Sequence, residues 1–130
     1  MTSLEPGIHI VSIMELKQVR KQSKKPVTVY FINRRKYFQP YPDTMKRYDN
    51  IYRRFSSKDP ENRRRIAMDG SSYENMYRRK IMNTGRALAK MRTMAEKSRE
   101  KPVYLVSEND FPDARIIKEI VEAQIGNEIW

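Results

Sequence analysis

The residues best suited to chemistry stand between an apolar run and an amphipathic pattern near the carboxyl end of the chain. They supply a hydroxyl, three carboxyl groups and a guanidinium, from Ser107, Glu108, Asp110, Asp113 and Arg115. Residues 103–106 are apolar and favour a strand, and Pro112 has the fixed φ that suits the first turn of a helix. The segment therefore predicts a strand, a polar turn and a helix, with the turn at the edge where α/β proteins usually place their sites.

Two kinds of ligand suit this turn. The free backbone N–H groups of a helix start, with the Arg115 guanidinium, favour an anion. Glu108, Asp110 and Asp113 are oxygen ligands of the type that Mg²⁺ prefers, although helix capping explains Asp110 and Asp113 better. We assign no metal and no cofactor to the turn.

Catalysis by a thiol or an imidazole is hard to assemble in this chain. Cysteine is absent, and the only histidine, His9, alternates with apolar residues as a strand residue does. The four glycines form neither of the phosphate-binding loops that nucleotide enzymes use. The turn therefore indicates a binding site, and we assign no catalytic residue.

Clusters of basic residues give the second functional signal. The run RRKYF at 34–38 interleaves cations with aromatic rings, which suits phosphate contact and base stacking, although its rings would equally cap the core from a loop. The runs at 63–65 and 78–80 are either ligand-binding or ion-paired with neighbours such as Glu61 and Glu74. The predicted binding residues are Arg34, Arg35, Lys36, Tyr37, Arg78, Arg79, Ser107 and Arg115.

The overall charge points to a polyanionic partner. The chain of 130 residues has a formal net charge of +11, and residues 46–101 carry 17 Lys or Arg against 7 Asp or Glu. Such a surface attracts polyanions, or else it serves solubility or ion-pair networks. No segment approaches the roughly 20 apolar residues of a membrane span, and the first residues lack a secretory pattern. We therefore expect a cytoplasmic protein with no membrane contact.

Hydrophobic periodicity predicts the elements. Strands are expected at residues 8–13, 27–32 and 103–106, the first two in central positions because both are almost continuously apolar. Helices are expected at 15–21, from Pro42 onward and after Pro112 to a stop at Gly126, whereas residues 56–70 predict a loop or a frayed helix. The fold class is α/β: one domain, 1–130, with a small, largely parallel sheet of at least three strands flanked by helices.

One long amphipathic helix is expected to run from Ser71 or Ser72 to beyond Ala95. Apolar residues at steps of three, four and seven are expected to form its buried face: Tyr73, Tyr77, Ile81, Leu88, Met91 and Ala95. Its opposite face carries Arg79, Arg86, Lys90 and Lys97. This basic face is either simply solvated or able to follow a phosphate backbone without reading sequence.

With these elements in order, the chain resembles the YeaO-like family of small uncharacterised α/β proteins from about Ile8 to Ile125. The resemblance rests on FQPYP at 38–42, on YENMYRR at 73–79, and on the strand and polar turn that open the last helix. Where the family turn carries Cys and then Cys-His-Arg, this chain has Ser107 and then Asp113, Ala114 and Arg115. The resemblance implies a fold and the location of a site, but only the arginine of that motif is retained.

Three functions follow from these observations. The first is a noncatalytic module that binds nucleic acid or another phosphate-bearing polyanion. The second is a nucleotide- or nucleic-acid-processing enzyme with a carboxylate site at the turn after the last strand. The third is a structural or assembly protein whose charges serve partner contacts.

Overall fold

The computed structural model describes residues 5–127, and the side chains of residues 5–124. Three strands and eight helical segments follow one another in the order β1 (Gly7–Val11), α1 (Ile13–Gln22), β2 (Thr28–Phe31), η1 (Ile32–Arg34), η2 (Lys36–Phe38), α2 (Pro42–Arg54), α3 (Pro60–Gly70), α4 (Tyr73–Met82), α5 (Gly85–Ser98), β3 (Pro102–Val106) and α6 (Asp113–Asn127). The strands form one parallel sheet in the order β1-β3-β2. The predicted small parallel α/β fold is confirmed.

The central strand is β3, and the prediction that the first two strands are central is wrong. Leu105 of β3 pairs with Ile10 of β1 on one side and with Tyr30 of β2 on the other. β3 is buried from Val103 to Val106, whereas every residue of β2 is only half-buried. Apolar composition therefore did not distinguish a central strand from an edge strand covered by helices on both faces.

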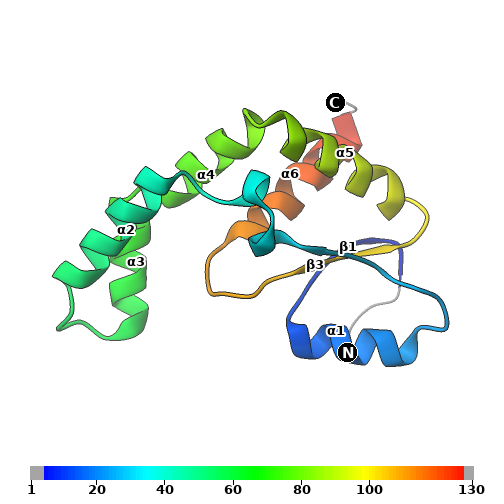
Figure 1. Ribbon diagram of the computed structural model, residues 1–130, viewed down its shortest axis with the longest axis horizontal. Helices are drawn as coiled ribbons and strands as arrows, with labels where there is room; N and C mark the ends of the chain where they lie inside the picture. The colour runs from blue at the N-terminus through cyan, green and yellow to red at the C-terminus, as the bar shows by residue number, and fades with distance from the viewer. Residues whose placement is uncertain (1–4, 128–130) are drawn as a thin grey trace.

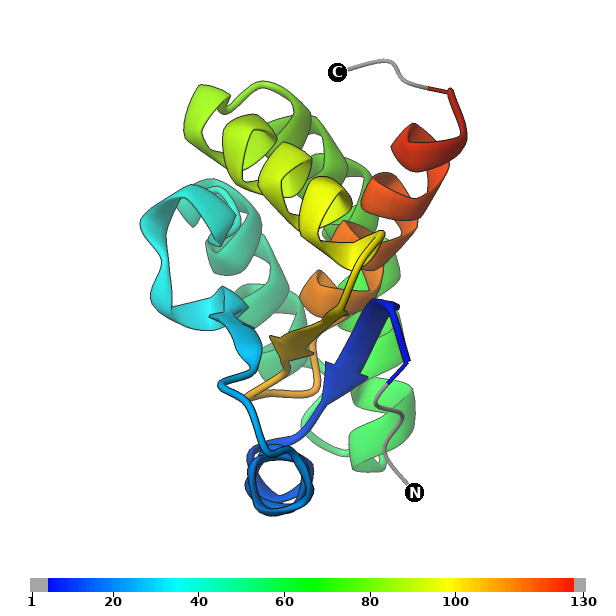
Figure 2. The same cartoon turned by 90° about the vertical axis from the view of Figure 1, so that its right-hand side faces the viewer.

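The two faces of the sheet are covered unequally (Figures 1 and 2). On one face α1 packs its buried Leu16 and Val19 against Tyr104 and Val106. On the other face α4, α5 and α6 surround Val103 and Leu105 and form the larger core. Because side chains alternate along a strand, β3 serves both cores at once.

The predicted single long helix is two helices, α4 and α5, which meet at Asn83 and Thr84. Asn83 Nδ2 donates to the Arg79 carbonyl at 2.8 Å, and Thr84 Oγ1 donates to the Lys80 carbonyl at 2.6 Å. These side chains satisfy carbonyls of the last turn of α4, and Thr84 has extended backbone angles, so the chain leaves the helix. The tyrosine face of α4 is buried as expected.

The buried face of α5 includes Met91 and Ala95, as predicted, but not Leu88. Leu88, expected in the core, is only half-buried, whereas Ala87, Met91 and Met94 are buried. The step of seven residues from Ile81 to Leu88 fits two turns of one continuous helix, but here it crosses the break.

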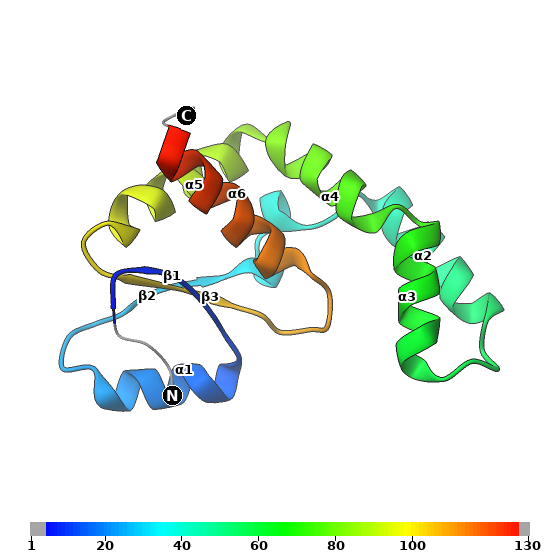
Figure 3. The ribbon, with the colours of Figure 1, turned by 180° about the vertical axis from the view of Figure 1, so that it is seen from behind.

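Helices α2 and α3 lie side by side and extend away from the sheet (Figures 1 and 3). α2 begins at Pro42, as predicted. Residues 56–70 contain a complete helix, α3, in place of the predicted loop or frayed helix. Its start is fixed because the Asp59 side chain accepts from the Asn62 backbone N–H at 3.0 Å and Pro60 occupies the first turn.

The last helix, α6, begins at Asp113 and buries Ile116, Ile117, Ile120 and Val121, as its period predicted. It continues past the expected stop at Gly126 to Asn127. None of the helices within residues 5–127 has the length and apolar character needed to cross a membrane.

Candidate functional site

The turn after β3 is held in place by hydrogen bonds within the turn and by Asn33, which lies in η1 just after β2. The Ser107 hydroxyl donates to the Asn109 carbonyl at 3.0 Å, and the Phe111 N–H donates to Asn109 Oδ1 at 3.0 Å. Asn33 Oδ1 accepts from the Glu108 N–H at 3.2 Å. Because parallel strands end at the same edge of the sheet, the loops after β2 and β3 meet.

The three carboxyl groups of the turn point to different partners. Glu108 accepts two hydrogen bonds from Arg34, at 2.9 and 3.2 Å, and Asp110 pairs with Arg64 of α3 at 2.8 Å. Asp113 lies apart from both and contacts Tyr73 of α4. Within the described residues, no three or more Asp, Glu or His side chains are close enough together to hold a metal ion.

The arginine expected to bind an anion at this turn is already paired. Arg115 contacts Glu74 of α4 and, at 2.9 Å, Glu119 one turn later in α6, and Glu119 also contacts Arg78. These hydrogen bonds raise the pKa of Arg115 and lower that of Glu119. An anion at this turn would have to displace a carboxylate.

Asp113 is the most unusual group of the region. Its side chain is 3% exposed, its Oδ1 accepts from the Tyr73 hydroxyl at 2.7 Å, and its Oδ2 accepts from Asn33 Nδ2 at 3.4 Å. Burial raises the pKa of Asp113 from 3.8 to about 6, although the Tyr73 hydrogen bond opposes the rise. Burial and the nearby carboxyl group also raise the pKa of Tyr73, which keeps its hydroxyl protonated as a donor.

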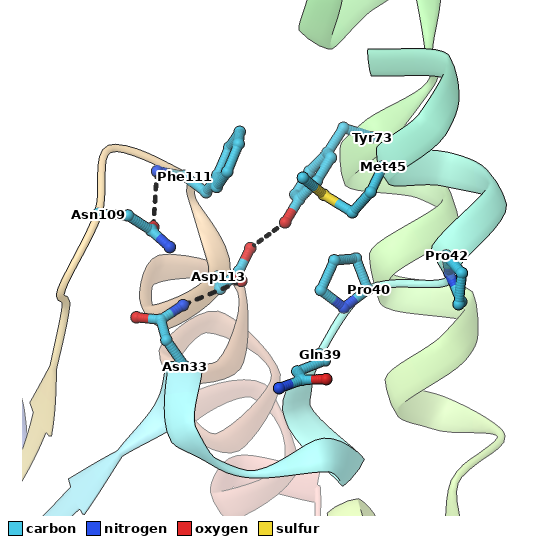
Figure 4. A pocket seen from close by; sticks show the side chains of 9 residues that line it. All are labelled: Asn33, Gln39, Pro40, Pro42, Met45, Tyr73, Asn109, Phe111 and Asp113. Carbon is cyan, nitrogen blue, oxygen red and sulfur yellow. Dashed lines mark hydrogen bonds between the residues drawn. The ribbon is translucent and has the colours of Figure 1, made fainter. Parts of the chain in front are cut away.

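A pocket of about 310 Å³ opens beside Asp113 (Figure 4). It is bounded by the segment between η2 and α2, by the turn after β3 and by Tyr73. Its lining residues are Asn33, Gln39, Pro40, Pro42, Met45, Tyr73, Asn109, Phe111 and Asp113. Asp113 lies at the centre of this set, between Asn33 and Tyr73.

Aromatic rings fix the position of Tyr73. Its ring stacks on Phe111, with centroids 5.2 Å apart, and on Tyr77, with centroids 6.0 Å apart. Tyr77 is fully buried and donates its hydroxyl to the Phe38 carbonyl at 2.6 Å. The carboxyl group of Asp113 therefore meets a rigid donor, because neither tyrosine has room to turn.

The other predicted binding residues lie in two groups. Arg34 reaches back to Glu108 and over the Phe31 ring, whereas Arg35 and Lys36 are exposed and form no ion pair with a described residue. Tyr37 is half-buried against Phe38. Arg79 is exposed on α4, also without an ion pair to a described residue, and its neighbour Lys80 donates to the carbonyls of Lys36 and Gln39.

Three exposed cations follow one side of α5. Arg86, Lys90 and Lys97 recur at steps of four and seven residues, so they share a face, and none forms an ion pair with a described residue. We call these three residues the α5 ridge. Arg79, predicted to continue the same row, lies on the separate helix α4.

The sequence did not assign Asn33 or Tyr73 to a site, and it assigned Asp113 only as a helix cap or as an oxygen ligand for Mg²⁺. Asn33 was identifiable, because a polar residue directly after a strand lies at the edge where sites form. Tyr73 was predicted only as a core residue, and its hydrogen bond to Asp113 was not predicted. No protein-family model, no curated protein and no solved structure matches this chain, and the resemblance to the YeaO-like family therefore stays a prediction.

Proposed function

We propose that the protein is a noncatalytic module that binds nucleic acid, or another phosphate-bearing polyanion, along the α5 ridge. One observation carries the proposal: Arg86, Lys90 and Lys97 lie on one exposed side of one helix, with no carboxylate partner among the described residues. Cations without internal partners are the groups that release counterions when they meet phosphates.

The surroundings of the ridge support this proposal. Burial raises the pKa of Tyr30 in β2, and the charge of Lys90 opposes the rise, which places Lys90 near the β2 edge of the sheet. η2 also packs against α5. η2 carries the exposed Lys36, which forms no ion pair with a described residue, next to the half-buried Tyr37.

The dimensions of the ridge suit a backbone contact. Arg86 and Lys97 are eleven residues apart, which is roughly 16 Å along a helix. A duplex strand passes several phosphates over that length. Contacts of this kind position a nucleic acid without reading its sequence, so we expect affinity without strong sequence preference.

The alternative of a carboxylate enzyme at the turn after β3 has less support. Glu108 and Asp110 are each engaged by an arginine, and the Ser107 hydroxyl donates to a carbonyl of its own turn. His9, the only imidazole of the chain, lies in β1, where its ring packs against Tyr104 and contacts the Glu5 carbonyl. No described imidazole is therefore in reach of Ser107 to act as a base.

The test measures binding of a short duplex and a single strand as a function of salt. The variant Arg86→Gln, Lys90→Gln, Lys97→Gln should weaken binding about tenfold or more at ~50 mM salt and make the log-log slope shallower by roughly 2 to 3. The matched control removes three charges from α1, on the other face of the sheet, with Lys17→Gln, Arg20→Gln and Lys21→Gln.

Equal losses in the two triple variants would mean that net charge alone attracts the polyanion, and would refute a site on α5. Absence of binding by the unmodified protein at ~50 mM salt would refute the function itself.

A further inference from the structure

The pocket beside Asp113 has a polar floor and largely apolar walls. Pro40 comes from the segment that leads into α2, Pro42 and Met45 come from the start of α2, and Phe111 comes from the turn after β3 (Figure 4). A pocket of about 310 Å³ is at the lower end of the range for small-molecule sites. It is open at the surface, and its position at the carboxyl edge of a parallel sheet is the usual position for a ligand.

The floor holds a carboxyl group that the fold leaves without a cation. Among the described residues, Asp113 receives hydrogen bonds only from neutral groups, the Tyr73 hydroxyl and the Asn33 amide, and the second is long at 3.4 Å. No described Lys or Arg forms an ion pair with Asp113. A carboxylate accepts about four hydrogen bonds, so both oxygens keep capacity for a donor that enters the pocket.

Helix capping does not account for this arrangement. Asp59 at the start of α3 accepts from a backbone N–H of its helix, whereas the described hydrogen bonds to the Asp113 carboxyl group come from the side chains of Tyr73 and Asn33. Asp113 is instead buried to 3% exposure against two tyrosines, which costs free energy without a compensating charge. Buried titratable groups without structural compensation, facing a cleft, are characteristic of binding sites.

The other polar groups of the pocket are amides. Gln39 and Asn109 are exposed at its edge, and the side chain of Gln39 forms no hydrogen bond to a described residue. An amide offers both a donor and an acceptor, which matches the mixed edge of a nitrogen heterocycle. The prolines and the Phe111 ring suit the faces of a flat ring.

We propose that this pocket binds a flat nitrogen heterocycle that carries an exocyclic amino group, the chemistry of an amino-bearing nucleobase, with the amino group donating to Asp113. An oxo group at the same place is disfavoured, because two acceptors would then face each other. The site does not rest on the proposed polyanion binding, since its ligand needs no phosphate and the pocket does not include the α5 ridge.

The test compares nucleosides that differ at one group. Guanosine is compared with inosine, which lacks the amino group, and cytidine with uridine, which has an oxo group in its place. Each nucleoside is titrated into the protein, and binding is measured by calorimetry or by the NMR shifts of the Asn33 and Asn109 amides. The amino-bearing member of at least one pair should bind about 10- to 100-fold more tightly. Nucleosides carry no phosphate, so neutralising the α5 ridge should leave these affinities unchanged.

The variant Asp113→Asn keeps the shape of the side chain and should abolish the preference for the amino group. The matched control is Asp110→Asn, an exposed carboxylate of the same turn that does not line this pocket. A second variant, Met45→Trp, should block the pocket from the opposite side and prevent binding even if Asp113→Asn unfolds. Binding without preference within each pair, or no binding at millimolar nucleoside, would overturn the proposal and leave Asp113 a purely structural partner of Tyr73.

Discussion

The turn after β3 and the α5 ridge are both rich in charge, but their charges are arranged in opposite ways. At the turn and beside it, Arg34, Arg64 and Arg115 each contact a carboxylate. On the ridge, Arg86, Lys90 and Lys97 extend from one helix face without such a partner among the described residues. Cations that were equivalent in the sequence therefore differ in the structure: those of the turn are already ion-paired, whereas those of the ridge are available to an anionic ligand.

The difference shows that the location of free charge depends on the acids nearby more than on the number of cations. The acidic residues of α6 and of the turn neutralise the arginines that surround them, whereas α5 presents only Glu96 on its exposed surface. A polyanion gains most where it replaces no existing ion pair, because displacing a carboxylate costs the attraction it provided. The following predictions test this contrast, from the largest expected effect to the smallest.

Stability should separate the two regions most clearly. Tyr77→Ala removes a fully buried ring and its hydrogen bond to the Phe38 carbonyl, and should lower the free energy of unfolding by about 3–5 kcal/mol. Lys90→Ala, on the ridge, should cost less than about 0.5 kcal/mol. Denaturant midpoints measure both. Similar midpoints for the two variants would show that Tyr77 does not anchor the region around the pocket.

Asp113 should make stability depend on pH. Its pKa is raised from 3.8 to about 6 by burial, so the folded protein holds this proton more tightly than the unfolded chain. The stability it contributes is present below about pH 4 and is lost as the pH rises through 6, a loss of up to about 3 kcal/mol.

Asp113→Asn removes this titration, and an Asn oxygen can still accept from the Tyr73 hydroxyl. Relative to the unmodified protein, the variant should be more stable above pH 6, with the advantage shrinking toward pH 4. Urea unfolding at pH 4, 5, 6 and 7.5 measures the difference, with Asp110→Asn as a control. A difference that does not change with pH would contradict the raised pKa.

The start of α5 should tolerate a stiffer residue. Gly85 occupies the first position of the helix, and a Cβ there would meet no atom within 4 Å. Gly85→Ala should therefore raise the free energy of unfolding by about 0.4–1 kcal/mol through a less disordered unfolded chain. Thermal unfolding of the variant and of the unmodified protein measures this gain in stability. Lower stability would mean that the junction between α4 and α5 needs the freedom of glycine.

The smallest effect is expected from releasing an arginine near α6. Glu119→Gln removes the shared partner of Arg78 and Arg115. Arg78 reaches α6, whereas Lys80 reaches η2, so these two cations leave α4 on different sides. Arg115 keeps its ion pair with Glu74, so Arg78 is the arginine that is released, and it lies away from the α5 ridge. The salt slope of polyanion binding should therefore not change measurably. A slope steeper by about 0.7–0.9 would move the site toward α6.

Local patterns in the sequence were sufficient for the strands and for α6, because their apolar periods are short and uninterrupted. They failed between Ile81 and Leu88, where the break depends on hydrogen bonds from Asn83 and Thr84 to the end of α4. They also missed α3, although Asp59 and Pro60 carried the start signal, because the residues after them are too polar to show a period.

The site was predicted less well than the fold. Its position at the edge of the sheet followed from the strand and turn pattern, and the neighbourhood of Asn33 and Ser107 followed from parallel topology. The burial of Asp113 did not, since it depends on Tyr73, a residue forty positions earlier in the chain. The pairing of the arginines likewise depends on contacts between helices that no local spacing reveals.

The position of β3 in the chain has a consequence for how the protein forms. β1 ends at Val11 and β2 at Phe31. These two strands do not pair with each other, and each pairs with β3, which begins only at Pro102. A ribosome must therefore release nearly all the helices before any strand can pair, and closing such distant contacts is slow. Until then the backbone edges of β1 and β2 are unpaired and their apolar side chains lack the core that β3 completes, so we expect the nascent chain to be most prone to aggregate just before β3 emerges.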